Sequence, residues 1–409
     1  MSKTQFADIV IIGGGLNGLA QALALVVHGV TCPVTDRADQ AAMLAPHFDG
    51  RVSAISSSSM KLFEAIGLGP ALEGKGCPIE QIWVSDGLKP GSLDFVPDAD
   101  DGYLGQMFEN QLTRRALYEA ALARPEIQLH MPAEIASSKT DEAGVRVELK
   151  NGDVLTGSLL VVAEGRKSVS RDAAGIRLTE WDYAHEAMVT AIFHEEPHKQ
   201  VAYEIFYPTG PFAILPMLDD EAGRHRSAIV WSVSRAEAPV YKKLSPRGMA
   251  HEIEKAMGGL LGDIEMNAPV MGYPLNFQHA NRVTDTRMVL VGDAAHGMHP
   301  IAGQGLNLGL RDVACLAQVV VEGMRLGLDP GDTQILERYT RWRSLDVQSV
   351  MMATDPLNKL FGIPGKTASA ARRLGLAAVQ RMKPLKDFFM AEARGESGNL
   401  PKLLQGLTV

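Results

Sequence analysis

The sequence has few cysteines and no long apolar run. These two absences argue against a disulfide-rich protein, a zinc protein and a membrane-spanning protein. Its 409 residues contain only three cysteines, Cys32, Cys77 and Cys315, which lie too far apart to suggest a disulfide framework or a zinc site. The longest apolar runs fall well short of the roughly 20 residues that span a bilayer. The opening residues, MSKTQFAD, lead directly into an apolar strand and leave no room for a signal peptide. We therefore expect a cytoplasmic protein in a reducing compartment.

An excess of positive charge is also missing. There are 40 Lys and Arg against 48 Asp and Glu, a formal net charge of −8. The composition therefore does not indicate a basic surface that binds nucleic acid. Low-complexity tracts and internal repeats are absent, and 46% of the residues are hydrophobic, as in a globular protein. The length predicts two or three domains with a sizeable core.

Near the start, the sequence carries a dinucleotide-binding fingerprint. Ile9–Ile12 is a continuous apolar run typical of a buried parallel strand, and GGGLNG follows it before a helix that extends to about residue 27. In this pattern Gly13 permits the tight turn, Gly15 lets the backbone approach a pyrophosphate, and Gly18 lets helix and strand pack closely. Asp36 lies after the second strand, where a ribose hydroxyl would be held.

A second glycine-rich loop lies at residues 288–312, which read MVLVGDAAHGMHPIAGQGLNLGLRD. The segment begins as a short strand, turns at Gly292-Asp293, and enters a helix near Leu306. Unpaired amides and the helix dipole at such a helix start can hold an anion or an electron-rich ring. Asp293 is placed to accept a hydrogen bond from a ribose or ribitol hydroxyl. The alternative is an ordinary strand–loop–helix joint in which the glycines serve packing.

Two further segments resemble parts of a ligand site. Arg51 precedes a run of small residues and could neutralise a diphosphate, although an exposed loop arginine is an equally good interpretation. The apolar strand at residues 159–162 ends at Glu164-Gly165, which is similar to the Gly292-Asp293 turn. Two such turns would face one ligand.

The middle of the chain has a different pattern of strands. An Asn151-Gly152 pair between apolar runs predicts a hairpin. From about residue 181, short strands alternate with turns, and we expect strands at Ala187–Phe193, Val201–Tyr207, Phe212–Leu215 and Ser227–Val233. The fold class is therefore α/β. We expect a Rossmann-like nucleotide-binding domain at 1–75, 105–178 and 282–350, an inserted substrate-binding β-sheet domain at 76–104 and 179–281, and a helical C-terminal segment at 351–409.

Taken in order, these motifs resemble those of the FAD-dependent aromatic hydroxylases, the para-hydroxybenzoate hydroxylase-like monooxygenases. Within that family the chain is most similar to the ubiquinone-biosynthesis hydroxylases. The most specific segments are DGRVSAISSSS at 49–59, ENQL at 109–112 and the whole of 288–312. Leu336, Tyr339, Arg343 and Asp346 match a later family pattern, so the resemblance covers essentially the whole chain. One departure is Glu164, where the family usually has Asp.

The resemblance implies a set of FAD contacts. The three fingerprint glycines would pack on the diphosphate, Asp36 would bind the adenosine ribose, and Arg51 with Gln111 would reach the diphosphate and ribitol. Asp293 would hold the ribitol, and amides from Gly303 to Asn307 would face the pyrimidine edge of the isoalloxazine. The implied cofactor-binding residues are Gly13, Gly15, Gly18, Asp36, Arg51, Gln111, Gly292, Asp293, Pro300, Gly303, Gly305, Leu306 and Asn307.

The chemistry that the resemblance implies is hydroxylation of an aromatic ring by a flavin C4a-hydroperoxide. The helix start at Gly305 would stabilise the anionic reduced flavin without a titrating side chain. We name no catalytic side chain, because neither His296 nor His299 has an identifiable carboxylate partner, and no metal site is indicated. No second strand-linked fingerprint is present, so NAD(P)H or another reductant would bind transiently, with O2 as co-substrate.

Other functions and partners remain open at this point. The alternatives are hydroxylation of a soluble phenol, or a non-catalytic flavin-binding redox protein; a flavin halogenase lacks support because its W-x-W-x-I-P signature is absent. Residues 366–402 contain eight Lys and Arg and three acids, 8 − 3 = +5, among apolar residues. Such a segment suits an anionic membrane surface or a partner protein, so the protein would be peripheral to the inner membrane. Helices packed on the FAD domain are the alternative, and a homo-oligomer is also open.

Overall fold

The computed structural model describes residues 3–45, 48, 50–88, 92–98, 102–297, 304–344, 346–347 and 366–409. Its nucleotide-binding region is a six-stranded sheet in the order β20-β21-β13-β2-β3-β9, parallel except for β20. The central strand β2 is buried along its whole length, as its continuous apolar run predicts. The strands are β2 (Ile9–Ile12), β3 (Cys32–Thr35), β9 (Ile127–His130), β13 (Leu159–Val162), β20 (Thr284–Asp285) and β21 (Met288–Leu290).

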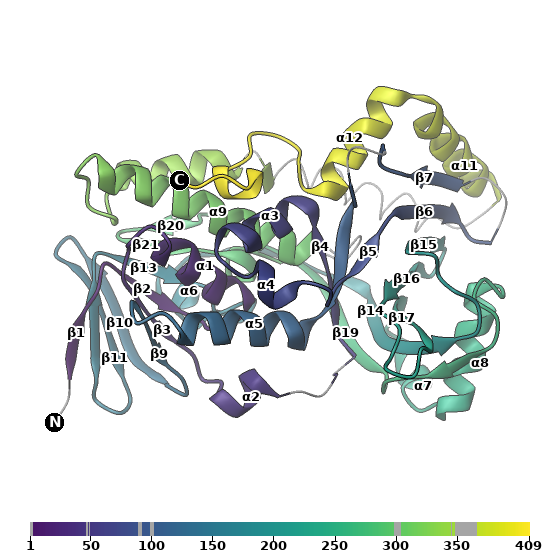
Figure 1. Cartoon of the computed structure of the whole chain (residues 1–409), viewed down its shortest axis with the longest axis horizontal. Helices are drawn as coiled ribbons and strands as arrows, with labels where there is room; N and C mark the ends of the chain where they lie inside the picture. Colours follow the sequence, from purple (N-terminus) through teal and green to yellow (C-terminus); the bar gives the residue numbers. More distant parts are fainter. Residues whose placement is uncertain are drawn as a thin grey trace.

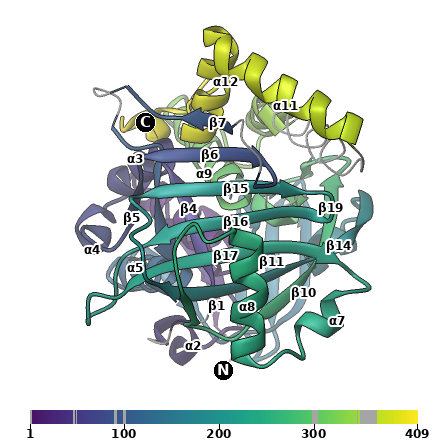
Figure 2. The ribbon, with the colours of Figure 1, turned by 90° about the vertical axis from the view of Figure 1, so that its right-hand side faces the viewer.

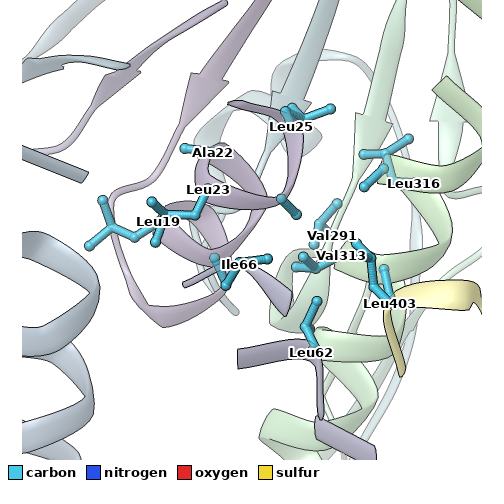
Figure 3. Packing of buried hydrophobic residues seen from close by; sticks show 14 of the residues in the cluster. Leu19, Ala22, Leu23, Leu25, Leu62, Ile66, Val291, Val313, Leu316 and Leu403 are labelled. Carbon is cyan, nitrogen blue, oxygen red and sulfur yellow. The ribbon is translucent and has the colours of Figure 1, made fainter. Parts of the chain in front are cut away.

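Helices cover this sheet and form the main core with it. Leu19 and Leu23 of α1 pack with Val291 and with Val313 of α9, and Leu403 near the C-terminus completes the cluster (Figure 3). These buried apolar side chains fix α1 and α9 against the sheet. The longer helices are α1 (Leu16–Val26), α3 (Ser57–Ala65), α5 (Asn110–Leu122) and α9 (Gln304–Arg325); the shorter ones are α2 (Gln40–Leu44), α4 (Gly69–Leu72) and α6 (Val169–Ala173).

Two small sheets flank the nucleotide-binding region. One lies at the end of the molecule that carries the N-terminus (Figure 1) and has the order β1-β12-β11-β10. Its β11–β12 hairpin confirms the prediction from Asn151-Gly152, and Gly152 has the positive φ, +93°, that the turn requires. The other has the order β4-β8-β5. The bounds are β1 (Thr4–Phe6), β10 (Ile135–Asp141), β11 (Gly144–Leu149), β12 (Val154–Gly157), β4 (Val52–Ser56), β8 (Gly105–Glu109) and β5 (Cys77–Ile79).

A nine-stranded sheet forms the other half of the molecule (Figure 2), with the order β22-β19-β14-β17-β16-β15-β6-β7 and β18 beside β14. The short helices α7 (Ala238–Tyr241) and α8 (Pro246–Met257) cover its outer face, where Met249 and Ile253 pack on Phe212 and Ile214. All four predicted strands are present, but β14 begins at Leu178 because its polar first half pairs with β19. The strands are β6 (Gln81–Asp86), β7 (Ser92–Phe95), β14 (Leu178–His194), β15 (Val201–Tyr207), β16 (Gly210–Met217), β17 (His225–Ser234), β18 (Ile264–Met266), β19 (Met271–Ala280) and β22 (His296–Gly297).

The two C-terminal helices, α11 (Lys366–Arg381) and α12 (Lys383–Arg394), lie beside β6 and β7 (Figures 1 and 2). Leu376 packs into the apolar cluster under β7, and Arg372 forms a buried ion pair with Asp86 of β6 at 2.8 Å. The expected alternative, packing on the FAD domain, is therefore wrong for α11, although the short helix η3 (Lys402–Gln405) does contact α3 and α9. Among the described residues, no helix is long and apolar enough to cross a membrane.

Candidate active site

The segments singled out in the sequence meet around one cavity of about 510 Å³ between the six-stranded sheet and the nine-stranded sheet. One side consists of loop residues that follow β2, β3, β13 and β21, together with the start of α9. The opposite side is the inner face of the nine-stranded sheet. The lining residues include Gly15, Leu16, Asn17, Asp36, Ala54, Asn110, Glu164, Gly165, Arg166, Asp293, Gly305 and Leu306 on the first side, and Glu204, Ala213, Leu215 and Val230 on the second. A larger cavity of about 1460 Å³ shares Val52, Asn110, Arg166 and Val230 with it.

The three fingerprint glycines differ in what surrounds them. Gly13 has φ +106°, and a β-carbon there would lie 2.4 Å from the carbonyl oxygen of Ala163. A β-carbon on Gly18 would lie 1.8 Å from the carbonyl oxygen of Gly13. On Gly15, by contrast, a β-carbon would meet no atom within 4 Å and would project into the cavity. Gly13 and Gly18 are therefore required by the turn and by helix–strand packing, whereas Gly15 keeps space open for a ligand.

The start of α1 offers backbone donors to that space. Gly15 is the N-cap residue, and no side chain caps the helix, so its first amides have no intrahelical partner. Asp36 lies at the end of β3 and also lines the cavity. Its carboxylate accepts hydrogen bonds from the backbone amides of Gly14, at 2.6 Å, and Ala38, at 2.8 Å. These bonds fix the carboxylate beside the anion-binding end of the helix.

The turn after β21, in the second glycine-rich segment, lies at the same edge of the sheet as the turns after β2 and β13, because these strands run parallel. Gly292 has φ +62°, and a β-carbon there would lie 2.2 Å from Nδ2 of Asn17, so this glycine is needed for packing beneath the cavity. Asp293 lines the cavity and lies 3.4 Å from Nε of Arg166 through its Oδ2 atom. Gly305 lies in the first turn of α9, and a β-carbon there would meet no atom within 4 Å. Among the residues that the structure describes, none fills the space beside Gly305, as none does beside Gly15.

Three other predicted residues lie around the cavity in different ways. The Asn307 side chain accepts from the Ser56 amide at 3.0 Å and donates to the Ala54 carbonyl at 2.8 Å, which fixes α9 to β4. Gln111 is buried; its Nε2 donates to Glu109 at 2.8 Å, while its Oε1 finds no donor among the described residues. Arg51 lines the larger cavity. Pro300 and Gly303, together with His299, lie outside the described residues.

The departure at Glu164 has a local explanation. Its Oε2 accepts hydrogen bonds from Oγ of Ser168, at 2.7 Å, and from the backbone amide of Ser170, at 2.9 Å. These groups belong to the first turn of α6, so the longer side chain caps the helix that follows it. The carboxylate that the family pattern places at the cofactor is thus engaged by its own turn, although Glu164 still lines the cavity.

The structure corrects the expectation that His296 has no carboxylate partner. Asp312, in α9, is 1% exposed at its side chain and accepts from Nε2 of His296 at 2.7 Å, from Nε of Arg343 at 2.6 Å and from the Gly292 amide at 2.8 Å. Asp346 extends the network through ion pairs with Arg343 and Arg311. The partner could not be identified from the sequence, because the contact depends on α9 lying alongside the turn that follows β21. This network holds the two ends of the glycine-rich loop together.

Removal of the Asp312 carboxylate should destabilise the protein strongly. The Asp312→Ala substitution would remove one of the two carboxylates that pair with the buried Arg343, and it would leave the His296 Nε2 and the Gly292 amide without their acceptor. Breaking a buried ion pair by removing one partner typically costs about 3–5 kcal/mol of unfolding free energy. A matched Asp182→Ala substitution removes a 65% exposed carboxylate paired with Arg235 at 3.3 Å and should cost less than about 1 kcal/mol. Urea denaturation of both variants checks the difference; equal, small losses would contradict the proposed role of the network.

The same network predicts a pH dependence. Burial alone would raise the pKa of Asp312, but its contacts with His296, Arg343 and the Gly292 amide outweigh burial and lower the pKa below its usual range. Because the folded pKa lies below the ordinary value of about 3.9, this stabilisation is complete above that pH. It is lost as the pH falls through the lowered pKa.

Sequence reasoning missed several residues that line the cavity. Asn110 accepts a hydrogen bond from Oγ of Ser53 at 2.7 Å and thereby joins α5 to β4. Arg166 donates to the carbonyl of Asn276 at 3.3 Å and so links the β13 turn to β19 of the larger sheet. Both residues lie within segments that the sequence analysis identified, ENQL and AEGRKS. Their position in these segments could have indicated that they line the cavity. Glu204 lies in none of the identified segments, so the sequence did not indicate its position in the cavity.

The residues present fit FAD. The starts of the two neighbouring helices α1 and α9, each with an open glycine, suit a diphosphate and a flavin ring. Carboxylates at Asp36 and Asp293 suit the ribose and ribitol hydroxyls. The buried Oε1 of Gln111, which finds no donor among the described residues, belongs to the residue that follows the cavity-lining Asn110. The inner face of the nine-stranded sheet would then cover the ring with small apolar side chains.

Comparison with known proteins gives the same result. A family model described as the FAD binding domain matches residues 6–354. The chain is 40% identical over 409 residues to ubiquinone hydroxylase UbiL of Rhodospirillum rubrum, covering 99% of this chain and 94% of that protein. It is 31% identical over 384 residues to the 3-demethoxyubiquinol 3-hydroxylase of Escherichia coli, covering 93% and 97%.

Solved structures with the same fold include p-nitrophenol 4-monooxygenase PnpA of Pseudomonas putida, with a TM-score of 0.78 and 16% identity, covering 97% of this chain and 100% of that one. The Diels-Alderase PyrE3 has a TM-score of 0.73 and 21% identity, covering 98% of this chain and 82% of that one. At these identities the likeness shows the fold alone. Its presence in enzymes with such different names means that function has to be argued from the site.

Proposed function

The chain belongs to the FAD binding domain family and is a FAD-dependent monooxygenase, and from this premise we propose that it hydroxylates the ring of a polyprenylated phenol in ubiquinone biosynthesis. The observation that supports this proposal most strongly is the cavity in which Gly15 and Gly305 both face open space opposite an apolar sheet. The names of the two curated relatives point to the same class of substrate.

Each side of the cavity has a distinct task in this proposal. The amides at the start of α1, with Asp36, would hold the adenosine diphosphate part of FAD, and the start of α9, with Asp293, would hold the flavin end. When bound, FAD supplies the activation of O2. Val230, Ala213 and Leu215 would position the aromatic ring and exclude water.

The electron donor would bind transiently. The sequence contains a single strand-linked fingerprint, and the start of α1 that follows it is assigned to FAD in this proposal. We propose NAD(P)H as the donor, docking at the larger cavity, where Arg51, Arg166, Lys167 and Arg177 gather positive charge.

Oxygen consumption by the purified FAD-containing protein tests the proposal. With NADH or NADPH, ortho-geranylphenol should stimulate oxygen uptake and yield a hydroxylated product, while unsubstituted phenol should do so poorly. Equal turnover of both would instead favour a soluble phenolic substrate. No hydroxylated product from either would favour a non-catalytic flavin-binding protein. Deletion of the gene and mass spectrometry of the accumulating quinone precursor would identify the natural substrate.

We further propose that α11 and α12 bring the enzyme to an anionic membrane surface. Their exposed apolar residues include Leu374 (73% exposed), Met382 (54%) and Phe388 (46%), and Arg381 and Lys383 are exposed beside Met382. A basic surface with protruding apolar side chains suits the interface of an anionic bilayer. Such a position would give access to a substrate whose polyprenyl tail lies in the membrane.

Reversal of two charges on these helices should weaken membrane binding. Each Lys or Arg near an anionic surface contributes about 1 kcal/mol, so the Arg381→Glu, Lys383→Glu pair should lower liposome partitioning at least about tenfold. The control is Lys139→Glu with Arg146→Glu, which makes the same charge change on exposed side chains of the small sheet at the other end of the molecule (Figure 1). Flotation with phosphatidylglycerol vesicles measures both. Equal flotation of the two double variants would contradict membrane docking by α11 and α12.

A further inference from the structure

The inner face of the nine-stranded sheet presents one acidic side chain to the cavity. Along β15, Tyr203 and Ile205 pack toward α8, so the alternation of the strand turns Glu204 to the opposite side, toward the cavity. Its neighbours across the sheet are Ala213 of β16 and Val84 of β6. With Leu215 and Val230 also lining the cavity, Glu204 is a polar group set in an apolar wall.

Glu204 has no partner for its carboxyl group. Among the described residues, none forms a hydrogen bond or an ion pair with it. Burial in this apolar wall raises its pKa from 4.5 to about 7, and no neighbouring charge contributes to the shift. An unpartnered carboxyl in an apolar environment is costly to the fold and is typical of a functional position.

The other charged residues that line the cavity are already engaged. They lie on the opposite wall: Asp36 accepts from backbone amides, Glu164 accepts from the α6 turn, and Arg166 is paired with Asp293 and donates to the Asn276 carbonyl. No histidine lines the cavity among the described residues. Glu204 is therefore the side chain best placed to exchange a proton with a ligand held against the sheet.

We propose that Glu204 is a catalytic residue that accepts the phenolic proton of the aromatic substrate. This inference rests on the proposed function, because it requires a phenol between the sheet and the start of α9. Removal of that proton would increase the electron density of the ring at the positions where oxygen is added. A base with a pKa close to the working pH is suited to this task.

The overall step balances as a monooxygenation. The ring carbon forms a bond to one oxygen atom of O2, the second oxygen leaves as water, and a reduced nicotinamide nucleotide supplies two electrons. The phenolic O–H bond breaks, and its proton goes to the Glu204 carboxylate. The ring carbon then loses its hydrogen as a proton, which together with the hydride of the nicotinamide completes the departing water, while one proton from solvent becomes the hydrogen of the new hydroxyl. The ring becomes aromatic again, and the phenolic oxygen regains its proton from Glu204.

Substitution by glutamine tests the role with little change in shape. With ortho-geranylphenol, Glu204→Gln should lower the kcat of hydroxylation by about 10²–10⁴ while KM and FAD content stay unchanged. Oxygen that is still consumed should appear as hydrogen peroxide. The wild-type rate should rise as the pH increases through about 7, because only the ionised carboxylate accepts a proton, and the variant should lack this rise. Glu204→Asp should recover part of the rate.

Two controls make these results specific. Glu265→Gln changes a 79% exposed glutamate of β18 in the same sheet and should retain both the wild-type kcat and the pH profile. Binding of 4-nitrophenol, which is yellow only as the phenolate, reports the contact without turnover. A nearby carboxylate opposes ionisation of a bound phenol, so the phenolate should form at a pH lower by about one unit in Glu204→Gln than in the wild type.

The two readouts separate the inference from the proposed function. If the wild type failed to hydroxylate but the 4-nitrophenol titration still shifted in Glu204→Gln, the proposed function would be wrong and the contact with Glu204 would stand. An unshifted titration, or hydroxylation by Glu204→Gln at the wild-type rate and pH profile, would overturn the role of Glu204.

Discussion

A Gly15→Val variant should purify as a folded, colourless protein without FAD. Gly15 has φ −74° and ψ −171°, an extended conformation that valine adopts readily, and nothing lies within 4 Å of the position of its β-carbon. The added side chain would therefore fit the protein and occupy the place proposed for the diphosphate. We expect the free energy of unfolding of the FAD-free protein to change by no more than about 1 kcal/mol. Absorbance of the released flavin per mole of protein measures occupancy.

Substitutions at two other glycines serve as controls for the Gly15→Val variant. Gly375 of α11 is equally unobstructed but does not line the cavity, so Gly375→Val should retain FAD. Gly18→Val should instead fail to fold, since its β-carbon would lie 1.8 Å from the Gly13 carbonyl oxygen. Full flavin occupancy in Gly15→Val would show that the diphosphate does not bind at the start of α1.

The Gly305→Val variant should retain some FAD and yet react slowly with reductant and with oxygen. The first amides of α9 have no intrahelical partner and would face the edge of the flavin that becomes negative on reduction. Valine keeps its backbone N–H, but its side chain would push the flavin edge away from these amides. Loss of one preorganised donor to a developing anion typically slows a reaction by about 10²–10³. Stopped-flow measurement of flavin reduction and reoxidation, on protein reconstituted with FAD, gives both rates.

A histidine in the same loop provides the comparison. His299→Ala should change both rates much less, because we expect this imidazole to orient the loop and to move no essential proton. Glu204→Gln should also leave both flavin rates intact, since its proposed proton transfer belongs to the later hydroxylation. The mechanism would be wrong if His299→Ala abolished both reactions with FAD bound while Gly305→Val stayed near the wild type.

Much of the fold could be predicted from local patterns in the sequence. The strand–glycine–helix pattern at residues 9–26 and the hairpin at Asn151-Gly152 depend on neighbours in the chain, and both predictions were correct. The strand at Val201–Tyr207 was predicted to the residue, because a run of apolar and aromatic residues lies between turn residues that mark both its ends. The early start of β14 was missed, since residues 178–186 are mostly polar and become a strand only by pairing with β19.

Contacts in the site between segments that are distant in the sequence could not be predicted from local patterns. The Asp312 contact with His296 depends on where α9 lies relative to the turn after β21, and the Asp86–Arg372 pair depends on where α11 lies. Glu204 illustrates the difficulty most clearly. Nothing around it in the sequence indicates an active site, and its position follows from the face that β15 turns toward a cavity shared with the other sheet.

The most direct test of the account is the fate of isotopically labelled oxygen. The FAD-containing protein would be given NADPH, ortho-geranylphenol and heavy-isotope O2, and the product would be analysed by mass spectrometry. The account predicts a ring hydroxyl that carries one labelled oxygen atom, and no such product from Gly15→Val. Label found only in hydrogen peroxide or water, with the phenol unchanged, would contradict the assignment of this cavity as the site of aromatic hydroxylation.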